Sequence, residues 1–142
     1  MDTMPTTVAV FITSEDALDV LVEHLTSANY RVVRACGRDF RTGQSSLSDF
    51  MAEHNPSVVV WDVSCPYYVN WSYLQHVRST PDFAGRVVIV TTPNVERLND
   101  AVGAPVPGAI ELVGNPHDLD LLLQSIHRAC ESLPTQVGSA DD

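Results

Sequence analysis

The sequence contains no lysine. Its eight basic residues other than histidine are all arginines, and 18 acidic residues give a formal net charge of −10. Binding to a nucleic-acid backbone depends on clustered cationic side chains that neutralise phosphates. This charge balance does not supply such a cluster, so we expect no direct binding to nucleic acid.

Cysteine and long apolar runs are also scarce. The three cysteines, Cys36, Cys65 and Cys130, form no close pair, which argues against a disulfide framework or a zinc knuckle. No apolar run reaches membrane length, and the first seven residues lack the basic and apolar regions of a secretory signal. We therefore expect a cytoplasmic protein without a membrane partner. Its length suits one domain, predicted over residues 1–133, followed by a disordered tail over 134–142.

Apolar runs of strand length alternate with stretches of helical spacing along the chain. The central run, VVVW from Val58, leads into Asp62 and then Pro66. Other strands are predicted over residues 8–12, 30–35, 86–92 and 109–113. Helices are predicted around Leu18–Leu25, over 47–54, after Pro66 with Asn70 as a cap, over 95–102 and from Pro116 onward. Residues 36–44 are a polar, glycine-bearing stretch, and a loop is predicted over 79–85.

This alternation predicts an α/β fold. Five strands, each followed by a helical segment, indicate a doubly wound parallel sheet with helices on both faces. In such sheets ligands and chemistry lie beyond the carboxyl ends of the strands. Asp62 is predicted to stand at one of these ends, although an acid there can also do no more than end the strand and cap the segment that follows.

The order of these residues resembles the receiver domain of bacterial response regulators, a flavodoxin-like fold of two-component phosphorelay signalling, over nearly the whole chain. In that family the third strand ends in the phospho-accepting aspartate, with a proline four residues later, as Asp62 and Pro66 stand here. A hydroxyl residue ends the fourth strand, which matches Thr91. The fifth strand follows Gly-Ala and precedes Lys-Pro, and the chain keeps Gly108, Ala109 and Pro116.

The first departure from the family concerns a metal ion. The resemblance implies an acidic pair at the end of the first strand that holds Mg²⁺, but Thr13 and Ser14 occupy those positions. The acids come one or two residues late, so the metal set that the resemblance implies is Glu15, Asp16, Asp62 and Ser64. Magnesium demands near-octahedral geometry, so displaced carboxylates would serve only through water or a remodelled loop. The alternative is that Glu15 and Asp16 are simply acids in the first turn of a helix.

The second departure is the family's lysine, whose position is taken by Asn115. Phosphoryl transfer is catalysed mainly by positioning and by stabilisation of charge on the phosphoryl oxygens. With no lysine in the chain to substitute, we expect phosphorylation at Asp62 to be slow or absent. The aromatic residue that the family often carries in the fifth strand is Leu112 here.

An aromatic cluster follows the Asp62 loop and consists of Tyr67, Tyr68, Trp71 and Tyr73. Tyrosine and tryptophan are enriched in binding hot spots, so this cluster is a candidate partner patch. Aromatic residues also contribute strongly to cores, and the second interpretation is that two of the four cover the sheet.

Two functions remain open from the sequence. The first is a stand-alone receiver-like module, a pseudo-receiver that contacts a sensor kinase, a phosphotransfer protein or an output protein. The second is a flavodoxin-like domain that binds a small molecule through the acidic pocket and Tyr67, Tyr68 and Trp71, although no phosphate-cradling glycine motif follows the first strand. We do not expect an enzyme, because no nucleophile, base and orienting group can be assembled from motifs.

Overall fold

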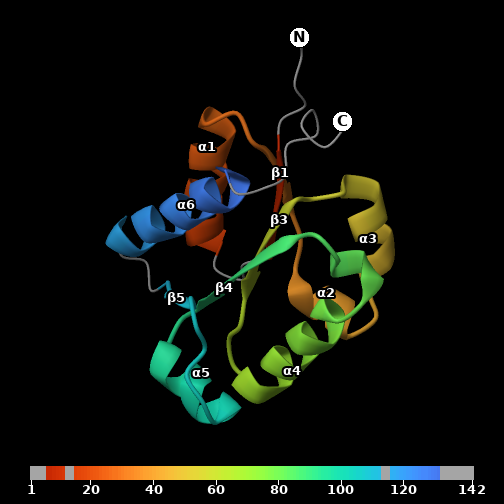
Figure 1. Cartoon of the computed structure of the whole chain (residues 1–142), viewed down its shortest axis with the longest axis vertical. Coiled ribbons are helices and arrows are strands. Elements are labelled where there is room, and N and C mark those ends of the chain that lie inside the picture. Colours follow the sequence, from red (N-terminus) through yellow and green to blue (C-terminus); the bar gives the residue numbers. More distant parts are fainter. Residues whose placement is uncertain (1–5, 12–14, 113–115, 132–142) are drawn as a thin grey trace, which may run out of the picture.

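The chain folds around one parallel sheet with the strand order β2-β1-β3-β4-β5 (Figure 1). The computed structural model describes residues 6–11, 15–112 and 116–131. The strands are β1 (Thr7–Phe11), β2 (Arg31–Arg34), β3 (Val58–Asp62), β4 (Val87–Thr92) and β5 (Ile110–Glu111). This topology confirms the doubly wound α/β fold predicted from the sequence.

Between and after the strands, the described residues form six α-helices and one short 3₁₀ segment. They are α1 (Glu15–Ser27), α2 (Gly37–Arg41), α3 (Leu47–His54), α4 (Tyr67–Arg78), η1 (Pro81–Phe83), α5 (Val95–Val102) and α6 (Pro116–Glu131). Within the described ranges no helix is long and apolar enough to cross a bilayer.

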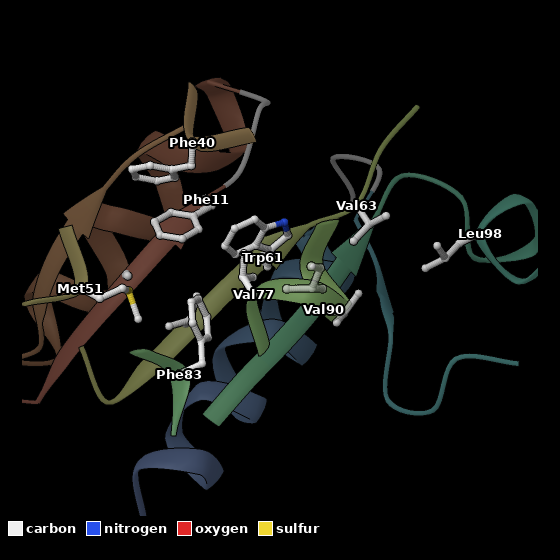
Figure 2. Close-up of a cluster of buried hydrophobic side chains, with 12 residues drawn as sticks. Phe11, Phe40, Met51, Trp61, Val63, Val77, Phe83, Val90 and Leu98 are labelled. Carbon is white, nitrogen blue, oxygen red and sulfur yellow. The ribbon is translucent and has the colours of Figure 1, made fainter. Parts of the chain in front are cut away.

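The central strands are mostly apolar, as expected where both faces of a sheet are covered. Alternate side chains of each strand enter two separate cores. Val8, Val10, Val58 and Val60 pack on one face with residues of α1 and α6. The other face packs against α2, α3, α4, η1 and α5 (Figure 2), and we call this cluster the second core. The period-2 alternation of the strands therefore places the two helical layers.

The polar, glycine-bearing stretch over residues 36–44 holds a helix that the sequence did not predict. It contains the short helix α2, in which Phe40 is 92% buried, with 8% of its surface exposed. The Phe40 ring lies 5.5 Å from that of Phe11 and 5.4 Å from that of Phe50, measured between centroids. Burial of this ring holds the turn in a segment that two glycines and local sequence would leave irregular.

The fifth strand is shorter than the predicted range 109–113. It pairs with β4 only at Thr91↔Ile110 and Thr92↔Glu111. Ala109 lies outside the strand, and Val113 lies outside the described residues, as do Ile12 of the predicted first strand and the predicted tail 134–142. Gly108, at φ 76°, directly precedes Ala109 and turns the chain toward the sheet. The chain therefore reaches β4 only at Ile110 and Glu111.

One polar contact outside the sheet edge gives a pH prediction. The Tyr30 hydroxyl lies 2.6 Å from His127 Nδ1 on α6, and burial, reinforced by Cys130, raises the pKa of Tyr30 to about 12. The folded state therefore favours neutral tyrosine. This stability is fully present below the unfolded pKa near 10 and is lost as pH rises through about 12.

We expect the melting temperature to fall more steeply between pH 9.5 and 12 in the native chain than in Tyr30→Phe. Tyr68→Phe is the matched control because Tyr68 is 64% exposed. Equal slopes in the native chain and Tyr30→Phe would contradict this role of Tyr30.

Candidate functional site

The predicted site residues Asp62 and Thr91 meet at the carboxyl edge of the sheet. They are register partners on the adjacent strands β3 and β4. The Thr91 hydroxyl donates a hydrogen bond of 2.9 Å to Asp62 Oδ1. Thr91 is fully buried, whereas Asp62 is partly exposed. Of the two residues joined by this hydrogen bond, Asp62 therefore lies nearer the surface. A ligand approaching this edge meets Asp62 before it meets Thr91.

Two hydrogen bonds hold the chain that follows Asp62. Val63 N–H donates to the Thr91 carbonyl at 2.7 Å, which extends the contact between the strands by one residue. The Asn70 side-chain amide donates to the carbonyl of Ser64 at 2.8 Å. Pro66 occupies the N-cap position of α4. The predicted role of Asn70 as the helix cap was therefore wrong: it lies inside the first turns and reaches back to the preceding loop.

A second acid, which sequence reasoning missed, lies at the neighbouring strand end. Glu111 Oε1 on β5 accepts a hydrogen bond of 3.0 Å from the backbone N–H of Val95, at the start of α5. Asn94 caps the same helix by accepting from Arg97 N–H at 3.0 Å. The only signal in the sequence is indirect: Glu111 is opposite Thr92, and the chain from Thr92 leads directly into α5.

The predicted magnesium site lies only partly within the described residues. Among the residues that the structure describes, no three or more histidine, cysteine, aspartate or glutamate side chains gather to hold a metal ion. The backbones of Glu15 and Asp16 lie in the first turn of α1, and their side chains are outside the description. Thr13 and Ser14 are outside it as well. The metal set named from the sequence therefore stays a prediction.

The position of the missing lysine, Asn115, also lies outside the described residues. Pro116 begins α6 directly after it. Both turn prolines named from the sequence, Pro66 and Pro116, thus precede or begin a helix. Proline suits these positions because the first N–H groups of a helix have no intrahelical partner.

The aromatic cluster divides between the core and the surface. Tyr67, Trp71 and Tyr73 are partly buried and pack against the second core. Tyr73 lies 5.9 Å from the ring of Trp61, between centroids, and burial raises the pKa of its hydroxyl. Tyr68 is 64% exposed, and its neighbour Val69 is 45% exposed. The exposed apolar surface here is consequently smaller than four aromatic residues would provide.

Comparisons with known proteins place this geometry in a fold. No protein-family model and no curated protein matches the sequence. Solved structures do match: a response regulator from Thermotoga maritima has a TM-score of 0.64 at 19% identity, covering 90% of this chain and 99% of that one.

Two further structures agree. The chemotaxis protein CheY4 of Vibrio cholerae has a TM-score of 0.58 at 21% identity, covering 89% of this chain and 99% of that chain. The receiver domain of a DNA-binding response regulator from Colwellia psychrerythraea has a TM-score of 0.57 at 23% identity, covering 90% and 99%. At these identities the likeness establishes the fold, which is that of response-regulator receiver domains.

Proposed function

We propose that this chain is a receiver-like module of two-component signal transduction that acts by protein–protein contact, with Asp62 as a residual phosphoryl acceptor. The observation that carries the proposal is the 2.9 Å hydrogen bond from Thr91 to Asp62 at the carboxyl edge of the two central strands of a receiver fold. This is the place at which such sheets carry out their chemistry. Its partners would be a sensor kinase, a phosphotransfer protein or an output protein, and the module would have no enzymatic activity of its own.

The weak chemistry follows from the charges available to a phosphoryl group on Asp62. The chain has no lysine, so a lysine ammonium group is not available at any position. A transferring phosphoryl group needs preorganised positive charge near its oxygens. The Thr91 hydroxyl can donate a hydrogen bond to such an oxygen but brings no charge. We infer that transfer to Asp62 is slow and that signalling relies on contact.

The alternative of a small-molecule site receives less support. It used Tyr67, Tyr68 and Trp71 as a ligand surface, and Tyr67 and Trp71 pack against the core. A thermal-shift panel of nucleotides and metabolites separates the two functions: we expect no shift of the melting temperature. A shift produced by one compound and lost in Tyr68→Ala would favour the alternative.

Incubation with acetyl phosphate and Mg²⁺ tests the chemistry directly. We expect the intact mass to stay that of the unmodified chain, under conditions that label a phosphorylatable receiver domain completely. Beryllofluoride should likewise leave the amide signals of Thr91 and Thr92 unshifted, because the site lacks the lysine that such adducts use.

Asp62→Asn is the control for that experiment, because it removes the acceptor oxygen but keeps an acceptor for the Thr91 hydroxyl. Stoichiometric addition of one phosphoryl group to the native chain, absent from Asp62→Asn, would show that Asp62 is a fully active acceptor.

A further inference from the structure

Within the described residues, the outer side of strand β4 is paired with another strand only at the last two residues of β4. On its inner side Val87 to Thr91 pair with β3 in continuous register. On its outer side β5 pairs only with Thr91 and Thr92 (Figure 1). Within the described ranges, Val87–Val90 therefore has no paired strand on this side over roughly 13 Å, at about 3.3 Å per residue, although Ile89 and Val90 are largely buried.

The ladder determines which backbone groups face this edge. In a parallel sheet the backbone N–H and carbonyl of one residue point to the same side of the strand, and those of the next residue point to the opposite side. Val87 N–H donates to the Ser57 carbonyl at 3.0 Å, and the Thr91 carbonyl accepts from Val63 N–H at 2.7 Å. Val87 and Thr91 thus face β3. Val88 and Val90 face the other way, so Val88 offers an N–H and a carbonyl to the open side and Val90 offers an N–H.

A groove of about 430 Å³ runs along this edge, and we name it the β4 edge groove. Helix α4 lines one side through Trp71, Gln75 and Arg78, while Ser125 of α6 lines it from the other layer. Because α4 and α6 cover opposite faces of the sheet, the groove lies in the plane of the sheet. A segment lying there in extended conformation would continue the sheet as an added strand.

The far wall of the groove is built from the chain between α5 and β5. Helix α5 ends at Gly103, whose φ of 88° is the left-handed conformation that glycine favours. Val106 N–H then donates to Asn99 Oδ1 at 3.0 Å, which ties the wall to the helix. The groove is therefore a formed feature of the fold, with residues 106–108 held beside β4.

The charges of the groove select among possible occupants. Arg78 is the one charged residue that lines it, and its Nη1 lies 3.4 Å from Gln75 Oε1. Among the described residues the only ion pair is Arg34–Asp19, so Arg78 has no carboxylate partner there. The remaining lining is mostly apolar. A second copy of the chain is disfavoured, because it would bring a net charge of −10 against an equal charge and a second Arg78 against the first.

We propose that the β4 edge groove binds an extended segment of a partner protein as an added strand. Its backbone bonds to Val88 and Val90, its apolar side chains alternate into the groove, and one carboxylate meets Arg78. Main-chain hydrogen bonds supply the affinity in this mode of recognition, and the alternate side chains supply the specificity. The site is independent of phosphorylation at Asp62, so it remains testable if the proposed signalling function fails.

The probe is a capped hexapeptide in which valine alternates with threonine and one threonine is replaced by aspartate. We expect it to shift the amide signals of Val88 and Val90 and to slow their hydrogen exchange. The same peptide with lysine in place of aspartate should bind about tenfold more weakly, because attraction to Arg78 becomes repulsion. A peptide N-methylated on its bonding edge should not bind, because its backbone donors are lost.

Charge reversal supplies the matched test. Arg78→Glu should invert the preference toward the lysine peptide, whereas Arg97→Glu, an exposed change on α5, should leave it unaltered. Val88→Pro removes an N–H from the open side without removing a bond to β3 and should abolish binding, with melting temperature as the check on folding. If Val88→Pro does not fold, the charge preference of Arg78→Glu still tests whether the peptide binds in the β4 edge groove.

Three results would overturn the proposal. One is equal binding of the aspartate and lysine peptides to the native chain. Another is peptide binding without protection of Val88 and Val90. The third is a dimer in sedimentation that protects these amides in the absence of peptide, which would assign the edge to a second copy.

Discussion

Asn115→Lys is expected to raise the rate at which acetyl phosphate and Mg²⁺ label Asp62 by about a hundredfold, the usual scale for one preorganised charge-stabilising group. The expectation comes from spacing: residue 115 directly precedes Pro116, where the receiver family carries its lysine. The change introduces the only lysine of the chain. Intact mass followed over time gives the rate.

Asn115→Gln separates charge from side-chain length and should leave the labelling rate at the native level. Asp62→Asn combined with Asn115→Lys should abolish labelling, which locates the adduct. An unchanged rate in Asn115→Lys would mean that the missing cation does not limit the chemistry. The limit would then lie with the acids Glu15 and Asp16, which come one or two residues later than the acidic pair of the receiver family.

Trp61→Ala is expected to lower the free energy of unfolding by about 3–5 kcal/mol, the usual cost of truncating a large buried aromatic residue. Trp61 is 3% exposed and lies at the centre of the second core (Figure 2). Its ring is 4.8 Å from Phe11 and 6.2 Å from Phe83, between centroids. Urea unfolding measures the loss, which is a large share of the roughly 5–15 kcal/mol that stabilises a typical domain.

Tyr68→Ala is the matched control because it truncates an aromatic residue that is 64% exposed. It should change the free energy of unfolding by no more than about 0.5 kcal/mol. Similar losses in both variants would mean that the Trp61 ring contributes no more than a surface side chain does. In that case the packing of the second core would not depend on it.

The sequence predicted the fold well because the signals that determine it are strong and local. Continuous apolar runs such as Val58–Trp61 mark strands covered on both faces, and the helix over 95–102 was predicted with the bounds that the structure has. Two features could not be read in this way. Helix α2 depends on burial of Phe40 against Phe11. The short β5 depends on how the chain after α5 approaches the sheet.

The candidate site was predictable only in part. Parallel strands whose carboxyl ends meet at one edge bring Asp62 and Thr91 together, and a 2.9 Å hydrogen bond joins them. Their roles as phosphoryl acceptor and switch hydroxyl stay predictions. Spacing could not reveal that Asn70 reaches back to Ser64 or that Glu111 reaches Val95, since both contacts depend on side-chain direction. The aromatic cluster illustrates the same difficulty, because composition does not distinguish the partly buried Trp71 from the exposed Tyr68.

The hydrogen bond between Glu111 and Val95 joins β5 to the start of α5. Its acceptor belongs to β5 and its donor is an N–H at the positive end of α5. Pulling the two apart would strip that amide of its acceptor and remove a negative charge from the end of the helix dipole. A bound protein that displaced Glu111 on β5 would therefore also weaken the start of α5, which couples the two elements at this corner of the molecule.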